Sequence, residues 1–346
     1  MSDRYLILEN GIVFKGKPFG FEGEAVGELV FTTGMTGYLE TLSDPSYFGQ
    51  IVLSTFPLIG NCGVNEQDAI PGPVYMKAYI VRQWCQEPSN FRSEGDLDAY
   101  LRAKKTPGLY GIDTRALASI IRKNGAMNAM VSDSPELSSE QWAALRGYSV
   151  TDAVAAVYAA TGAFTRKEAE QSILIWDFGG AFRLVEQLKV FGLSPDVVPY
   201  FTPAEEIMTR KPDGLILSGG PGNPCENQMI VKEIEKLCRN GLPILGVGLG
   251  HQMLALARGG KTEKLPFGHR GANQPVREKR TSRVFVTAQN HGYAVTAGSL
   301  PDAAAVSYIN LNDGTCEGVV YKDAPTISVQ FEPTDEVIAE FLTLLK

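Results

Sequence analysis

The chain has 346 residues, a length that favours two domains, each large enough to bury a hydrophobic core. Hydrophobic residues make up 44% and charged residues 21%, and a net charge of −7 without a dense Lys/Arg tract argues against nucleic-acid binding. The sequence shows no signal peptide and no apolar run of the roughly 18–20 residues that span a bilayer. Five cysteines without a C-x-x-C pair indicate free thiols, without disulfides or a metal site. We therefore expect a cytoplasmic protein that contacts no membrane.

The first half of the chain predicts mostly β structure. Residues 4–14 contain two apolar runs around Asn10-Gly11, a dipeptide that favours a hairpin in which both turn positions have positive φ. Further strands are expected over 29–31 and 51–53, and helices over 113–122, capped by Asp113 or Thr114, and over 134–146.

The second half alternates short apolar runs with helical patterns. Strands are expected over 173–176, 196–199, 214–217 and 243–247, and helices after 180, over 229–237 and over 336–345. Continuous apolar strands separated by helices predict a parallel sheet covered on both faces. We expect an α/β protein with a β-rich mixed α/β domain over 1–150, a linker over 151–170, and a doubly wound, flavodoxin-like domain over 171–346.

A glycine stands where the local pattern calls for a nucleophile. Gly246-Val247-Gly248-Leu249-Gly250 follows an apolar strand and precedes a helix, which is the nucleophile-elbow pattern G-x-nucleophile-x-G. Gly248 has no side chain that could attack a substrate. A glycine there also relieves the backbone strain that a side chain would suffer.

Two other loops follow strand ends and are expected to meet the elbow, because ligands of parallel sheets bind beyond the carboxyl ends of the strands. The loop 218–224 is rich in glycine, which exposes backbone N–H groups suited to an oxyanion hole. It lacks the Lys-Ser/Thr pair of a phosphate-binding loop, and a plain tight turn is an equally good interpretation. The loop 329–334 carries Glu332.

Two short motifs match known patterns by chance. Gly246, Gly248 and Gly250 suggest a dinucleotide fingerprint, but His251 occupies the place of its last glycine and the strand is a late one. Asp177-Phe178-Gly179 matches the magnesium triplet of kinases, but the other kinase loops are missing.

Read together, these segments resemble class I glutamine amidotransferases, and nearly the whole chain resembles the small subunits of carbamoyl phosphate synthetases. The first-half segments are specific to these subunits, because other amidotransferases lack the N-terminal domain. The segments that carry the resemblance are 31–38, 44–47, 60–61, 88–92, 111–117, 218–224, 249–252, 267–273, 289–295 and 310–315.

The resemblance implies a protein that hydrolyses glutamine and passes ammonia through a tunnel to a large subunit, which binds ATP and magnesium. It places the catalytic Cys, His and Glu of the family at Gly248, Glu332 and Thr334, and an oxyanion hole at the backbone N–H groups of Gly220 and Leu249. The glutamine-contacting positions fall on Ser46, Gly220, Gly222, Leu249, Gln252, Asn290, Gly292 and Tyr293.

All three catalytic positions are altered, and the loop after them is shortened before the final helix. Three coordinated losses favour natural decay over engineering. We therefore expect a small subunit without glutaminase activity and without a cofactor of its own, paired as a heterodimer with a large subunit that uses free ammonia. Two alternatives stay open: a glutamine-binding regulatory module, and an active amidotransferase that uses Cys225. The sequence does not distinguish arginine from pyrimidine biosynthesis.

Overall fold

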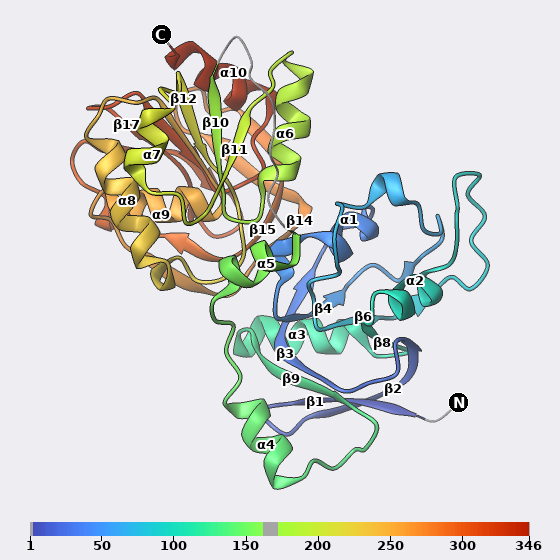
Figure 1. Cartoon of the computed structure of the whole chain (residues 1–346). Helices are drawn as coiled ribbons and strands as arrows, with labels where there is room; N and C mark the ends of the chain where they lie inside the picture. Colours follow the sequence, from blue (N-terminus) through green and yellow to red (C-terminus); the bar gives the residue numbers. More distant parts are fainter. Residues whose placement is uncertain (1–2, 162–171, 346) are drawn as a thin grey trace. The chain divides into compact units, whose positions relative to one another are not determined.

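A computed structural model describes residues 3–161 and 172–345, which form two compact units (Figure 1). The first unit comprises Met1–Val150 with His269–Gly271, and the second comprises Thr151–Gly268 with Ala272–Lys346. In the described part of the chain, no helix is both long and apolar enough to cross a bilayer.

The first unit is built on a closed barrel whose strands follow the order β1-β2-β8-β6-β4-β3-β9. Strands β3, β4, β6 and β8 run parallel to one another, and the remaining pairs are antiparallel. A short parallel pair, β5 with β7, lies outside the barrel. The bounds are β1 Arg4–Leu8, β2 Val13–Gly20, β3 Ala25–Thr32, β4 Gln50–Ser54, β5 Leu58–Ile59, β6 Ala78–Val81, β7 Gln83–Trp84, β8 Pro107–Tyr110 and β9 Met127–Ser132.

The expected hairpin is present, but its turn differs from the expected one. Strands β1 and β2 pair antiparallel, and the backbone N–H of Gly11 donates to Leu8 O at 2.9 Å. Gly11 has a φ of 89°, whereas Asn10 is not among the residues with positive φ. The loop is therefore a three-residue connection that ends in a left-handed glycine, and the expectation of positive φ at both positions was wrong.

The helices of the first unit confirm one capping prediction and correct another. Helix α3 (Thr114–Asn124) is capped by Asp113, whose carboxylate accepts from Ala116 N at 3.0 Å. Helix α4 (Ser139–Arg146) begins later than expected, because Ser138 and Gln141 form a capping box that fixes its start. The other helical segments are α1 Tyr38–Ser43, η1 Pro45–Tyr47, η2 Glu66–Asp68 and α2 Leu97–Ala103.

The second unit contains a nine-stranded sheet in the order β11-β10-β12-β13-β18-β17-β15-β14-β16. The first five strands are parallel, and in chain order they read 2-1-3-4-5, the doubly wound order of flavodoxin-like folds. This part of the fold confirms the prediction. The bounds are β10 Ile173–Asp177, β11 Asp196–Pro199, β12 Gly214–Leu217, β13 Ile244–Val247, β14 Thr262–Glu278, β15 Val284–Val295, β16 Ala304–Asn310, β17 Cys316–Tyr321 and β18 Thr326–Val329.

Helices cover both faces of the parallel strands (Figure 1). Alternate residues of each strand point to opposite faces, so Trp176 joins one apolar core and Ile175 joins the other. The first core is closed by α7, α8 and α9, and the second by α6 and α10. The bounds are α6 Ala181–Val190, α7 Ala204–Thr209, η3 Pro224–Glu226, α8 Gln228–Cys238, α9 Leu249–Ala257, η4 Ala297–Ser299 and α10 Asp335–Leu344.

Part of the stretch 151–170, expected as a linker, is helical. Helix α5 (Ala153–Thr161) belongs to the second unit, and Ala153, Val154 and Val157 are buried. The segment AVAAVYAA consists almost entirely of apolar residues with good helix propensity, which favours a packed helix over an extended linker. The rest of the expected linker, from 162 on, lies outside the described residues.

Candidate functional site

The elbow expected from the glycine pattern is present at the end of β13. Gly248 has φ 54° and ψ −113°, and it leads directly into α9. Its backbone N–H donates to Val329 O at 2.9 Å, which ties the elbow to the end of β18. Leu249 is the first residue of α9, so its N–H has no acceptor within the helix and remains available to a ligand.

The three loops expected to converge do lie together. A Cβ built on Gly248 would lie 3.3 Å from Gly219 Cα and 3.9 Å from Gln330 O. The loop after β12 is anchored in turn by Gly180 N, which donates to Gly219 O at 2.9 Å. The elbow is therefore in contact with the glycine-rich loop and with the end of β18.

Glycine is sterically required at Gly250. A Cβ there would lie 2.3 Å from Leu217 O, whereas a Cβ on Gly219 would meet nothing within 4 Å. We expect Gly250→Ala to lower the free energy of unfolding by about 1–3 kcal/mol, despite the better helix propensity of alanine. Gly219→Ala is the matched control and is expected to change it by less than about 0.5 kcal/mol. Urea unfolding of both variants tests this, and equal stability would contradict it.

The two other positions expected to be catalytic, 332 and 334, carry side chains that interact with residues outside the elbow. Glu332 is half exposed and forms an ion pair with Arg183 on α6. The loop is fixed further by Gln187, whose amide donates to Pro333 O at 2.5 Å. Thr334 is the N-cap residue of α10; the pKa of Glu336 is lowered by its own backbone N–H and by the Thr334 hydroxyl. The described interactions of residues 332 and 334 are therefore with Arg183 and Glu336.

Gln252 is held rigidly one turn into α9. Its Nε2 donates to Tyr293 O at 2.7 Å and to Gln330 Oε1 at 2.8 Å, and the residue is buried. Both amide hydrogens are thereby engaged, and the Oε1 atom keeps its capacity to accept. The sequence placed Gln252 among the glutamine-contacting positions, and its oxygen has the chemistry to accept from a ligand.

Three more of the expected contact positions lie on β15. Asn290 and Gly292 alternate with buried neighbours, so they lie on the opposite face of the strand from His291. Tyr293 follows them and supplies the carbonyl that accepts from Gln252. Gly222, another expected position, has a φ of 88° in the loop after β12, a conformation that favours glycine.

Ser46 belongs to the first unit, where it lies in η1. Its backbone N–H donates to Asp44 Oδ1 at 2.9 Å, so Asp44 caps this short helix. Pro45 lies at its first position, which favours the helical start. The sequence Asp44-Pro45-Ser46 thus explains the local conformation of Ser46.

Cys225, the alternative nucleophile, lies in η3 and is exposed. Its sulfur is 3.5 Å from the hydroxyl of Thr262, a group that cannot act as a base at neutral pH. An activated thiol needs a neighbouring base or cation. This contact therefore gives no support to a catalytic Cys225.

Asp177 has a structural role at the end of β10. Its Oδ1 accepts from Gly179 N at 2.7 Å and from Ala181 N at 3.2 Å, so it holds the turn that leads into α6. Burial raises the pKa of this carboxyl, and the two backbone N–H groups act against that shift. These bonds explain the Asp-Phe-Gly triplet without kinase chemistry.

Sequence reasoning did not identify a buried pair behind the elbow. His251 Nδ1 lies 2.8 Å from Ser328 Oγ, and both residues are buried. Burial lowers the pKa of His251 to about 3. Ser328 is only 1% exposed, so the pair is inaccessible to a substrate and acts as part of the core. The only sequence signal is the position of His251 on the inner face of an apolar helix.

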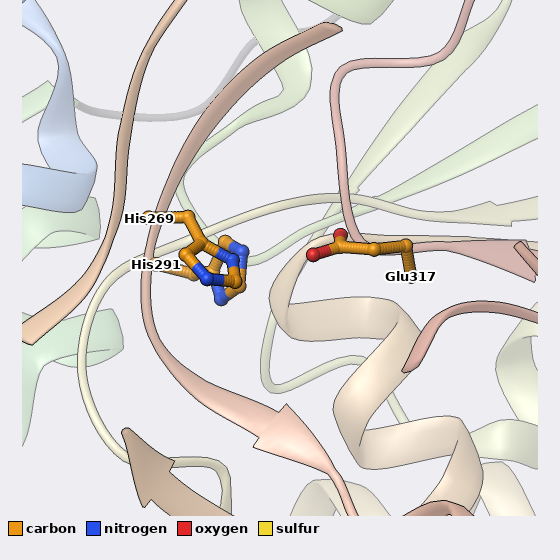
Figure 2. Close-up of side chains that lie close together, drawn as sticks. All are labelled: His269, His291 and Glu317. Carbon is orange, nitrogen blue, oxygen red and sulfur yellow. The ribbon is translucent and has the colours of Figure 1, made fainter. Parts of the chain in front are cut away.

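A second group that the sequence did not predict contains His269, His291 and Glu317, whose donor atoms lie within 4.8 Å of one another (Figure 2). A metal ion needs a deprotonated ring nitrogen from each histidine. His291 Nδ1 lies 2.8 Å from Tyr293 O and Nε2 lies 3.0 Å from Gln289 Oε1, so both nitrogens already face oxygen atoms. The residues present do not fit a metal ion in this arrangement.

The first unit contains a cavity of 290 Å³, at the small end of the range of ligand sites. It lies beyond the carboxyl ends of the parallel strands β3 and β4, where Thr32 and Ser54 line it. Arg92 forms an ion pair with Asp68 at its wall, with 2.7 Å between Nη2 and Oδ1. Sequence reasoning did not predict this cavity.

Comparison with known proteins identifies the family of both halves. The family model of the carbamoyl-phosphate synthase small chain, CPSase domain, matches residues 6–131, and the model of glutamine amidotransferase class-I matches residues 174–337. Curated relatives named carbamoyl phosphate synthase small chain include one from Clostridium perfringens, 46% identical over 95% of this chain and 93% of the relative. Another, from Syntrophotalea carbinolica, is 43% identical over 95% of this chain and 92% of the relative.

A third relative, from Halalkalibacterium halodurans, is named carbamoyl phosphate synthase pyrimidine-specific small chain and is 45% identical over 95% of this chain and 91% of the relative. The matches extend over both units and almost the full length of these relatives. The resemblance inferred from the sequence motifs is confirmed. The chain therefore belongs to the carbamoyl phosphate synthase small chain family and carries a class I glutamine amidotransferase domain.

Proposed function

We propose that this chain is a carbamoyl phosphate synthase small chain without glutaminase activity, which acts as a scaffold for a large chain that uses free ammonia. The observation that carries the proposal is Gly248 at the elbow, where the backbone is shaped for a nucleophile that is absent. Glu332 and Thr334 support it, because their partners are Arg183 and Glu336. A triad without nucleophile and base retains only a small residual activity.

The partner that this proposal requires is a large chain that binds ATP and magnesium, in a heterodimer. The relatives are named small chains, which supports such a partner. The five free cysteines suit a reducing cytoplasm.

The test is to purify the complex with its large chain and to supply amide-labelled glutamine or ammonium chloride. We expect carbamoyl phosphate from ammonia, and glutamine hydrolysis no faster than the background rate. The Cys225→Ser variant should behave in the same way as the unmodified chain. Glutamine hydrolysis abolished by that substitution would overturn the proposal in favour of a substitute thiol.

A second candidate is a glutamine-binding regulatory module, favoured by the fixed Gln252 side chain and its accepting Oε1. The N–H of Leu249 adds a donor nearby at the start of α9. Calorimetry with millimolar glutamine tests this candidate, with Gln252→Leu expected to abolish binding. The control is the exposed Gln228→Leu on α8, and absence of heat with the unmodified chain would remove the candidate.

A further inference from the structure

A row of buried polar side chains lies on one face of β15. Thr287, Gln289 and His291 alternate along the strand and are 3%, 5% and 8% exposed. Residues two apart in a strand share a face, so these side chains lie next to one another. Buried polar groups need hydrogen-bond partners, and the partners of this row determine where its hydrogens lie.

Two backbone carbonyl oxygens, which can only accept, determine the direction of each hydrogen bond in the row. Thr287 Oγ1 donates to the carbonyl oxygen of Gln274 at 3.0 Å, and it accepts from Gln289 Nε2 at 3.1 Å. Gln289 Oε1 is then an acceptor that faces His291 Nε2 at 3.0 Å. His291 Nδ1 faces another fixed acceptor, Tyr293 O, at 2.8 Å. In this pattern both ring nitrogens of His291 carry a hydrogen.

The reversed amide of Gln289 gives a poorer set of bonds. Its oxygen would then face Thr287 Oγ1, whose single hydrogen cannot serve both that oxygen and Gln274 O at 3.0 Å. One buried acceptor would lose a donor, which is unfavourable inside a protein. The orientation that leaves every bond of the row satisfied is the one that protonates both nitrogens of His291.

Glu317 supplies a compensating negative charge. Glu317 is 0% exposed, and one of its carboxylate oxygens lies within 4.8 Å of a ring nitrogen of His291. Figure 2 shows its carboxylate directed toward the two imidazole rings, one of which belongs to His269 on β14. Glu317 Oε1 accepts from Asn310 Nδ2 at 3.1 Å, which fixes the position of the carboxylate. A buried cation beside a buried carboxylate avoids the cost of an isolated charge.

We propose that His291 is held as an imidazolium between the polar row of β15 and Glu317, and that it is a positioning residue for Tyr293 and Gln252. His291, Glu317, Tyr293 and Gln252 all belong to the second unit. Tyr293 O accepts from His291 Nδ1 and from Gln252 Nε2, so one carbonyl joins the charged pair to the amide on α9. The role is independent of whether the chain hydrolyses or binds glutamine.

Nitrogen-15 NMR of the full chain labelled at histidine tests this proposal, because the chain has only three histidines. His291→Asn identifies the relevant signals. At pH 7.5 we expect hydrogens on both ring nitrogens of His291. Glu317→Gln should remove one of these two hydrogens and speed the exchange of the Gln252 side-chain amide with water. The exposed Glu263→Gln on β14 is the control and should leave both unchanged.

A His291 ring with a single hydrogen in the unmodified chain would overturn the proposal, whether or not the Glu317 variant folds. Retention of both hydrogens in folded Glu317→Gln would also overturn it, because the carboxylate would then have no part in the charge. Stoichiometric binding of Zn²⁺ with loss of ring N–H hydrogens would show a metal site in place of an imidazolium.

Discussion

Introducing Cys, His and Glu together at positions 248, 332 and 334 is expected to give glutamine hydrolysis, whereas introducing the thiol alone is not. Gly248→Cys places a Cβ 3.3 Å from Gly219 Cα and 3.9 Å from Gln330 O, a tight but available space. The left-handed φ of 54° makes a side chain there cost about 1–3 kcal/mol of stability. A thiol without a base stays largely protonated at neutral pH and reacts slowly.

The base is expected to account for most of the recovered rate. In the single variant, Glu332 remains paired with Arg183. The triple variant Gly248→Cys, Glu332→His, Thr334→Glu removes this ion pair and supplies an imidazole with a carboxylate to orient it. General-base catalysis contributes typically about 10²–10⁴-fold, so we expect the triple variant to exceed the single one by a factor in this range.

The measurement is glutamate release by the complex with its large chain. A triple variant that carries serine in place of cysteine at position 248 is the control, because serine is the weaker nucleophile. A triple variant no faster than Gly248→Cys would contradict the prediction. It would place the remaining defect in the segment that leads from Thr334 directly into α10.

The parallel sheet could be predicted because each of its strands is a continuous run of apolar residues in the sequence. Residues 173–176, 214–217 and 243–247 fall on β10, β12 and β13 within one residue at each end. Burial on both faces leaves no room for polar alternation, which makes such strands easy to recognise. Helix α3 was equally clear, because Asp113 and Gly125 mark its two ends.

Local details failed where competing hydrogen bonds decide the conformation. Asn10-Gly11 indicated a two-residue turn, but the bond from Gly11 N to Leu8 O selects a longer connection. The start of α4 is set by the capping box of Ser138, although the residues from 134 on also favour a helix start. Residue patterns leave more than one boundary open at such places, and the hydrogen bonds of the folded chain select one of them.

For the candidate site too, the backbone turn could be predicted from the sequence, whereas the side-chain contacts could not. The elbow could be predicted from Gly246, Gly248 and Gly250, because a sharp strand-to-helix turn needs small residues in consecutive order. The partners of its side chains could not be predicted. Arg183 and Glu332 are 149 residues apart, and His251 and Ser328 are 77 residues apart. Such contacts are created by the sheet order, and no local pattern encodes them.

Acidification is expected to destabilise the second unit through His251 more than through a typical surface group. The folded state lowers the pKa of this imidazole from 6.5 to about 3 by burial. The unfolded chain therefore binds one more proton than the folded chain between these values, and stability falls as the pH falls. Titration of His251 leaves the free energy of unfolding unchanged above pH 6.5. Below pH 6.5 it lowers this free energy by about 1.4 kcal/mol per pH unit, which amounts to about 2 kcal/mol at pH 5.

Urea unfolding at pH 7.5 and pH 5, with the unmodified chain and His251→Gln, separates this effect from that of the carboxylates. The glutamine side chain keeps a polar atom for Ser328 Oγ but does not titrate. We expect the variant to lose about 2 kcal/mol less than the unmodified chain over this range, whatever its stability at pH 7.5. Equal losses would show that His251 gains access to water or to a compensating anion before the chain unfolds.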